Sequence, residues 1–419
     1  MRINQKESVT PTITIRYVSW SLFAVMFGVL IIQILQLPEV SLWALRIIIV
    51  YIVFKNLNRL IDLRNIDRWG FNLTVIFIGW LLIQFFRATF YAEGYWMWKN
   101  ILDQLLIILF FIVIIVSTNL KLVQEYYRLY WKFFLPLILM SFIIDKTPLN
   151  LSYVPFSVLM LFFALIPKNK KWYLLGLILF YFAANTQRND IIKIIAASSI
   201  GLSISYLFPI IPKKGIYFAQ MTFLILPFIL LVLGITGIFN VFKMDEYIKG
   251  DYTQEVKTTN GIEEDDLTAD TRTFIFENVF YTMEKYDAWI IGRSPSFGDE
   301  GVDDFWGINE ISGLKGRFGN EVGVMDILLW YGLIGVFIYF LIYVRASYLA
   351  IYKSRNRYAK SIGLYVAFLW MWAFIWEKPL FETYFMMDLI LLGLCFSTTF
   401  RQFNDDQMEL WIRGIFQKQ

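Results

Sequence analysis

The sequence predicts an all-α polytopic membrane protein with about twelve transmembrane helices and one large extracytoplasmic loop. Three observations lead to this fold class: the composition, a series of long apolar runs, and an alternation of basic residues between the runs. Of the 419 residues, 58% are hydrophobic, 19% are aromatic and only 17% are charged. A soluble domain has about a quarter of its residues charged, so a soluble fold is excluded.

The apolar runs have the length that a membrane-spanning helix needs. Residues 17–38, 147–167, 217–242 and 327–344 contain no charged residue, and a helix of about 20 apolar residues crosses a bilayer core. Lipid cannot hydrogen-bond an open backbone, so each run is expected to be helical. The runs show no alternation of apolar and polar residues with period 2, so an outer-membrane barrel is not expected. The predicted spans are 17–37, 40–54, 70–86, 103–119, 129–144, 150–166, 172–186, 191–211, 217–239, 325–344, 361–376 and 383–400.

Basic residues predict the orientation of these spans, because cytoplasmic loops carry an excess of lysine and arginine. Every second connection is rich in them, while the opposite short loops carry few. The predicted cytoplasmic residues are Arg2, Lys6, Arg16, Lys55, Arg59, Arg64, Arg68, Lys121, Arg128, Lys132, Lys168, Lys170, Lys171, Lys213, Lys214, Arg345, Lys353, Arg355, Arg357, Lys360, Arg401, Arg413 and Lys418. Both termini are therefore expected in the cytoplasm. The net charge of +4 comes from this bias and does not indicate nucleic acid.

The chain divides into three parts on this topology. Residues 1–239 hold helices one to nine, 240–324 form the extracytoplasmic loop, and 325–419 hold helices ten to twelve and a cytoplasmic tail. The first apolar stretch is too long for a cleavable signal and lacks a small-residue cleavage site, so we expect it to be retained. The loop contains 18 acidic and 8 basic residues between 240 and 323.

The loop is expected to contain an amphipathic helix followed by a turning segment. Asp270 would cap a helix that runs to about Ala288, lying on the membrane surface or over a cavity. The predicted apolar face consists of Ile275, Val279, Phe280 and Met283. The segment 243–266 before this helix is polar and acidic. Eight glycines between 292 and 323 indicate tight turns in place of regular structure.

The residue types limit the chemistry. The chain has no histidine and one cysteine, which removes the commonest general base, the commonest transition-metal ligand and any internal disulfide. We expect Cys395 to be a core residue. No phosphate-binding Gly-x-x-x-x-Gly-Lys-Ser/Thr loop is present, so ATP is not the expected driver. The sequence predicts neither a metal nor a cofactor, and chemistry would depend on Asp, Glu, Arg, Lys, Tyr or backbone.

Charged residues at the outer membrane face are the candidates for function. Arg188 precedes the eighth span, Arg272 opens the loop helix, Arg317 and Glu321 precede the tenth span, and Arg87 ends the third. The arginine fork binds phosphate oxygens in pairs, and a helix N-terminus beside Arg272 would add anion affinity.

Each candidate also has a structural interpretation. Arg188 beside Asp190 fits an interfacial salt bridge, and Arg272 fits a solvated loop charge. Arg317 and Glu321, four residues apart, fit a local helix-surface pair. Arg87 fits a membrane anchor as well as a substrate contact. The remaining charges near the lipid are expected to be structural pairs or pore-side groups. These are Arg46, Asp326 and Asp388.

Three stretches resemble the O-antigen polymerase and O-antigen ligase superfamily. Residues 186–190, Thr-Gln-Arg-Asn-Asp, are similar to its Ser-Arg segment that opens a span. Asp270-Thr-Arg272, followed by Gly-Arg-Ser-Pro-Ser-Phe-Gly at 292–298, resembles its loop pattern. Residues 320–335 resemble its closing segment, in which a polar residue precedes a span that carries Gly-Leu-Ile-Gly. The resemblance covers 170–345 in detail and implies a fold of the GT-C-like type.

The resemblance implies a metal-independent glycosyltransferase of the cell inner membrane that uses undecaprenyl diphosphate as its leaving group. Catalytic roles would fall to Glu321 as base and to Arg272 and Arg188 at the diphosphate, with Arg317 and Arg87 binding substrate. Ligases of the superfamily carry a histidine before the Gly-Leu-Ile-Gly span, whereas this chain has Glu321 nearby and no histidine. That difference favours a polymerase of lipid-linked repeat units over a ligase. The implied partners are lipid-linked donor and acceptor glycans, a flippase and a chain-length regulator.

Three alternatives remain at this stage. A ligase would move the finished glycan to an acceptor. A flippase or other transporter should line a spanning cavity with charges at several depths, while a scaffold would need no site at all. The concentration of candidate residues at the outer face favours chemistry there.

Overall fold

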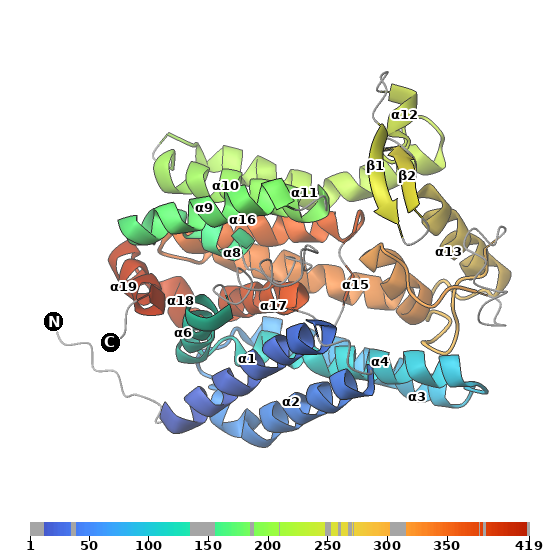
Figure 1. Ribbon diagram of the computed structural model, residues 1–419, viewed down its shortest axis with the longest axis horizontal. Coiled ribbons are helices and arrows are strands. Elements are labelled where there is room, and N and C mark those ends of the chain that lie inside the picture. Colours follow the sequence, from blue (N-terminus) through green and yellow to red (C-terminus); the bar gives the residue numbers. More distant parts are fainter. Residues whose placement is uncertain are drawn as a thin grey trace.

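The computed structural model describes residues 12–34, 39–134, 156–184, 188–208, 210–247, 253–258, 261–266, 270, 272–301, 316–376, 378–379 and 383–416. In these residues the chain is a bundle of long helices with a small two-stranded sheet at one end (Figure 1). This is the architecture of a helical membrane protein, as the composition predicts.

The helices of the first half are α1 Thr12–Ile34, α2 Glu39–Leu60, α3 Arg68–Thr89, α4 Tyr95–Phe110, α5 Ile112–Val116, α6 Leu120–Leu129, α8 Phe156–Leu161, α9 Lys168–Ala184, α10 Arg188–Tyr206 and α11 Lys213–Ile235. A π-helical turn, Tyr130–Phe134, continues α6, and a 3₁₀ turn, Phe163–Leu165, follows α8. The second half contains α12 Met244–Tyr247, β1 Thr253–Thr258, β2 Gly261–Asp266, α13 Thr273–Lys285, α15 Gly323–Tyr352, α16 Arg357–Trp372, α17 Thr383–Phe396, α18 Thr398–Gln402 and α19 Asp405–Phe416.

Four helical segments in the described part of the chain are long and apolar enough to cross a membrane. They are Arg68–Thr89, Tyr95–Val116, Lys213–Ile235 and Gly323–Tyr352, and two shorter apolar helices cover Ile191–Tyr206 and Tyr384–Phe396. The described part of the predicted span 150–166 is interrupted, because α8 ends at Leu161 and a 3₁₀ turn follows. Most of the predicted span 129–144 lies outside the described residues.

Several of the connections that are rich in basic residues lie together at one end of the bundle. At one end, Arg345 pairs with Asp67 at 2.8 Å, the Asn65 amide donates to the Thr118 carbonyl at 3.1 Å, and Arg357 donates to the Ser205 carbonyl at 2.9 Å. These contacts join the segments after the second and tenth predicted spans to each other and to the last turns of the fourth and eighth spans. The helices α6, α18 and α19 also lie at this end, opposite β1, β2 and α13 (Figure 1).

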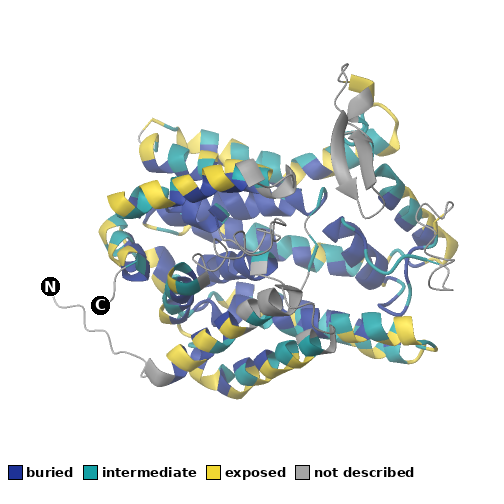
Figure 2. Ribbon diagram, viewed as in Figure 1, coloured by how far each residue is buried: buried dark blue, intermediate teal, exposed yellow. Residues whose placement is uncertain are grey.

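The core lies around α15, α16 and α17, which are buried over most of their length (Figure 2). The outer helices instead expose large apolar side chains, such as Ile83 and Phe86 on α3 and Val232 on α11. Such surfaces match a lipid environment. Cys395 lies in the core as expected.

Arg46 and Asp388 each have a partner of opposite charge, which agrees with the structural pairs that were one of the two expectations for them. Arg46 lies 3.6 Å from Asp103, joining α2 to α4, and Lys193 lies 3.2 Å from Asp388, joining α10 to α17. Burying an ion is costly unless a partner of opposite charge compensates it. The two pairs therefore fix how these helices meet.

Helix α15 is broken in its first half at Gly332, which has φ 67° and ψ −173°. The loop segment after α13 completes the break: Leu333 N and Ile334 N donate to the carbonyls of Trp289 and Ile290, at 2.8 and 3.3 Å. In return, the N–H groups at 293 and 294 donate to the carbonyls at 329 and 330. Backbone groups at the break are therefore hydrogen-bonded to the loop segment, and a helix in lipid requires such partners for its backbone.

The sheet is a structure that the sequence analysis did not anticipate in the acidic segment 243–266. Strands β1 and β2 pair antiparallel, with Thr253 opposite Asp266 and Thr258 opposite Gly261. The sequence Asn-Gly at 260–261 is a common turn signal, and Gly261 is already the first residue of β2. The acidic composition of the segment gave no indication of these strands.

Candidate outer-face site

The loop helix predicted from the sequence is present as α13 and begins where expected. The Asp270 carboxylate accepts from the backbone N–H groups of Arg272 and Thr273, at 3.0 and 2.9 Å, so it satisfies donors that a helix start leaves open. The predicted apolar side chains of α13 face inward: Ile275, Val279 and Met283 are buried and Phe280 is half-buried. The helix packs against α15.

Arg272 and Glu321 meet at the end of the bundle that carries α13. The Arg272 guanidinium lies 3.9 Å from the Glu321 carboxylate and 5.2 Å from the centre of the Trp376 ring. The Arg272 side chain is 20% exposed and that of Glu321 is 40% exposed. The loop, the segment before α15 and the segment after α16 therefore converge on one partly open position.

Both residues were predicted from the sequence, but their pairing was not. The interpretation of Arg317 and Glu321 as a helix-surface pair is wrong, because α15 begins only at Gly323 and Glu321 pairs with Arg272. Trp376 was missed, since an aromatic residue near a membrane surface ordinarily reads as part of an interface belt. No local pattern would have singled it out.

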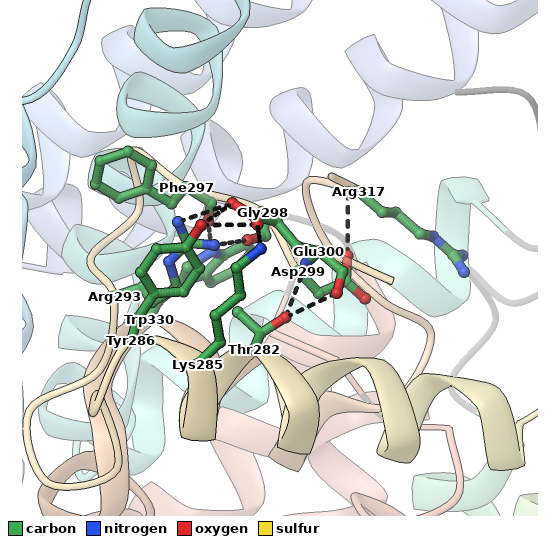
Figure 3. A network of polar contacts seen from close by, with 10 residues as sticks. All are labelled: Thr282, Lys285, Tyr286, Arg293, Phe297, Gly298, Asp299, Glu300, Arg317 and Trp330. Atoms are coloured by element: carbon green, nitrogen blue, oxygen red, sulfur yellow. Dashed lines mark hydrogen bonds and ion pairs between the residues drawn. The ribbon is translucent and has the colours of Figure 1, made fainter. Parts of the chain in front are cut away.

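Arg317 is held through its backbone. Its N–H donates to the Asp299 carbonyl at 3.0 Å and to the Asp299 carboxylate at 3.1 Å. The guanidinium points away from the neighbouring Arg293 and Glu300 (Figure 3), and no described side chain is bonded to it. Burial raises the pKa of Asp299 to about 6, although the Arg317 N–H opposes this shift.

Asn320 directly precedes Glu321 and is hydrogen-bonded to Asp326. The buried Asp326 carboxylate accepts from the Asn320 N–H at 2.7 Å. The Asn320 side chain is fully buried, and neither end of its amide has a hydrogen-bond partner in the described part of the chain. An unpaired buried amide costs about 1–3 kcal/mol, and such groups point to a functional position or a bound water.

Arg87 lies apart from this position. Its guanidinium donates to the Gly292 carbonyl, beside the break in α15. Nearby, Ser296 donates to the Ala88 carbonyl at 2.5 Å and the Asn100 amide donates to the Pro295 carbonyl at 2.7 Å. In this arrangement Arg87 joins α3 to the loop, which favours a structural role over a substrate contact.

Arg188 is the first residue of α10, where the sequence places the opening of a span. Its side chain and that of Asp190 lie outside the described residues, so the proposed salt bridge between them is not tested. The buried pair of Lys193 and Asp388 fixes the same end of α10 against α17.

A second polar cluster holds the turning segment on α13 (Figure 3). Glu300 accepts from Lys285 at 2.8 Å, from Tyr286 at 2.7 Å and from Arg293 at 3.2 Å. Burial opposes ionisation of Glu300, but these three partners together lower its pKa. Arg293 also lies 3.8 Å from the Tyr286 ring centre, and its side chain is only 8% exposed. The cluster therefore holds the turning segment against α13.

The position between Arg272, Glu321 and Trp376 offers a fixed cation, a partly exposed carboxylate and an aromatic face. A cation of this kind binds an anionic group such as a phosphate, and a carboxylate can accept a proton. Within the described residues, no group of three His, Cys, Asp or Glu is arranged to hold a metal ion. No known protein family, curated protein or solved structure was found to match the chain.

Proposed function

We propose that the protein polymerises undecaprenyl-diphosphate-linked oligosaccharide repeat units into O-antigen, capsule or exopolysaccharide at the outer face of the bacterial inner membrane. The observation that carries the proposal is the meeting of Arg272 and Glu321 at 3.9 Å, beside the Trp376 ring. The resemblance of residues 170–345 to the O-antigen polymerase and ligase superfamily supplies the substrate class.

In the proposed reaction, a hydroxyl oxygen of one repeat unit attacks the anomeric carbon of another. The bond from that carbon to the diphosphate oxygen breaks, and undecaprenyl diphosphate leaves with the bonding electrons. Glu321 accepts the hydroxyl proton. Arg272 stabilises the negative charge that develops on the diphosphate, with Arg188 and Arg317 as further anion contacts.

The loose pairing of Arg272 and Glu321 suits this division of roles. At 3.9 Å and with both side chains partly exposed, the ion pair is worth little, about 0–1 kcal/mol. A diphosphate that carries more charge than one carboxylate would draw the guanidinium to itself. The carboxylate would then be free to act as the base. The neighbouring ring of Trp376 would offer a flat surface to a sugar.

The proposal includes a topology of about twelve spans in a GT-C-like arrangement, with both termini in the cytoplasm and the site outside. The sorting of connections onto two ends supports it, because the basic segments that contain Asp67, Arg345 and Arg357 share one end, while Arg272 and Glu321 lie at the other. A flippase and a chain-length regulator are the proposed partners.

Deletion of the gene followed by gel analysis of surface glycan tests the proposal. Surface lipid capped by a single repeat unit would support a polymerase. Full-length polymer stranded on undecaprenyl diphosphate would instead indicate the ligase that the resemblance also allows. Loss of the intermediates at the outer face would indicate a flippase.

Complementation of the deletion strain assigns the residues. We expect Arg272→Ala and Glu321→Gln to abolish long polymer while the protein remains at wild-type abundance in the membrane. Arg64→Ala, which changes an arginine that is 86% exposed at the opposite end, is the matched control and should restore normal polymer. A normal length distribution with both site variants would refute the proposed roles.

A further inference from the structure

A groove of about 550 Å³ lies between the outer part of α11, the start of α13 and the end of α16. Its walls are apolar and include Leu230, Leu231 and Gly234 of α11, Phe276 and Phe280 of α13, and Phe374. The volume falls in the range of small-molecule sites, about 300–1,000 Å³. Side chains of the loop helix form one wall and a membrane-type helix forms another.

The position of α11 determines what surrounds this groove. The helix is among those long and apolar enough to cross a membrane, and its outer part exposes Ile229, Val232 and Ile235 by 49, 58 and 65%. Apolar side chains exposed at this density on a spanning helix face hydrocarbon. The groove therefore opens among lipid chains, and an apolar chain would enter it without passing through water.

The rim of the groove is polar and adjoins the outer-face site. Its polar lining residues, among those described, are Asn240, Thr273 and Glu277, and all three belong to the loop. The Asn240 amide donates to the Thr273 hydroxyl at 2.7 Å. Thr273 directly follows Arg272, so the groove wall continues into the residue that carries the site's cation.

The wall formed by α16 continues in the same way. Ile375 lines the groove and directly precedes Trp376, whose ring lies 5.2 Å from the Arg272 guanidinium. Two of the three walls thus run into the Arg272 position. A ligand with an apolar chain in the groove would place an anionic head group beside that guanidinium.

We propose that this groove binds the polyprenyl chain of the lipid-linked donor, with its phosphates beside Arg272. This inference rests on the proposed function for the identity of the lipid. The geometry favours a long apolar chain with a compact anionic head, because two walls of the groove continue to the Arg272 guanidinium.

Filling the groove tests the proposal directly. A Cβ at Gly234 would meet only the Phe239 carbonyl oxygen, at 4.0 Å, so Gly234→Trp adds bulk to the groove without a backbone clash. Gly176→Trp on α9 is the matched control, since Gly176 is exposed and nothing lies within 4 Å of its Cβ position. Each purified protein is incubated with undecaprenyl phosphate in detergent, and retained lipid is measured by native mass spectrometry.

We expect wild type and Gly176→Trp to retain undecaprenyl phosphate and Gly234→Trp to retain at least tenfold less. Equal retention by both variants would overturn the proposal. Retention of phosphatidylglycerol in place of undecaprenyl phosphate by the wild type would overturn it too, because the groove would then be a site for bulk phospholipid. This measurement involves no glycosyl transfer, so normal binding without polymerisation would refute the proposed function alone.

Photocrosslinking provides a second measurement, which detects contact with the lipid instead of affinity. Benzoylphenylalanine replaces Phe280, in the groove, or Trp172, which is 76% exposed on α9. Crosslinking to undecaprenyl phosphate from position 280 and not from position 172 would support the groove. Equal labelling from the two positions would show that the lipid has no preferred place and would overturn the inference.

Discussion

Replacing Gly332 by alanine is expected to destabilise the protein strongly, because this glycine allows α15 to break. Its backbone, at φ 67° and ψ −173°, is in a region that essentially only glycine adopts, and a side chain there costs about 1–3 kcal/mol. The added Cβ would also lie 2.3 Å from the Ile290 carbonyl oxygen and 2.6 Å from the Gly292 nitrogen. Both contacts are with backbone atoms of the loop segment after α13, so this segment and α15 must move apart.

Moving these two segments apart would weaken the hydrogen bonds from Leu333 and Ile334 to the loop carbonyls. Each is worth about 1 kcal/mol net. Together with the strain, the expected loss is about 3–5 kcal/mol, which is large for a single methyl group.

Thermal unfolding in detergent, followed by tryptophan fluorescence, measures this effect. Gly176→Ala is the control, because Gly176 lies inside α9 with open space around its Cβ position. In a helix interior this change should stabilise by about 0.5–1 kcal/mol. The two variants should therefore move the melting temperature in opposite directions. A melting temperature for Gly332→Ala at or above that of wild type would refute the reasoning.

Two further predictions concern buried charges. The pKa of Asp299 is about 6 in the folded protein, against an ordinary value of 3.8. Between these values the folded state binds more protons than the unfolded state. The free energy of unfolding of the wild type should therefore fall by roughly 3 kcal/mol as pH rises from 4 to 6. Asp299→Asn should remove this dependence and melt higher than wild type at pH 8 but not at pH 4; identical melting profiles would contradict the assignment. Lys193→Met should cost about 3–5 kcal/mol by leaving Asp388 without its 3.2 Å partner, and adding Asp388→Leu should recover most of that loss. If the double variant melts no higher than the single variant, the pair is not the source of the effect.

The sequence was most informative where a local pattern decides the structure. Asp270 and the spacing of Ile275, Val279 and Met283 predicted the start and the buried face of α13, because capping and helical periodicity act over a few residues. The basic connections likewise predicted that the segments after the second and tenth spans lie at the same end, where Asp67 and Arg345 pair.

The site depended on contacts that no local pattern encodes. Arg272 and Glu321 were both predicted as site residues, but their pairing depends on how α13 packs on α15. Trp376 joins them only because α16 ends at the same place. The break at Gly332 was also beyond sequence reasoning, since it requires a second glycine, Gly292, at a distant point of the chain to let two backbones touch.

The bonds that join the loop to α3 and α4 have a consequence for biogenesis. Ser296 bonds to Ala88 and Asn100 to Pro295 across separations of 208 and 195 residues. At about 5–20 residues per second of synthesis, α3 waits roughly 10–40 seconds for its partner to emerge. During that interval the ends of α3 and α4 that contact the loop are incomplete, and the nascent protein is open to insertase, chaperone or protease at that surface. Quality control of this protein should therefore act on chains that stop before residue 296.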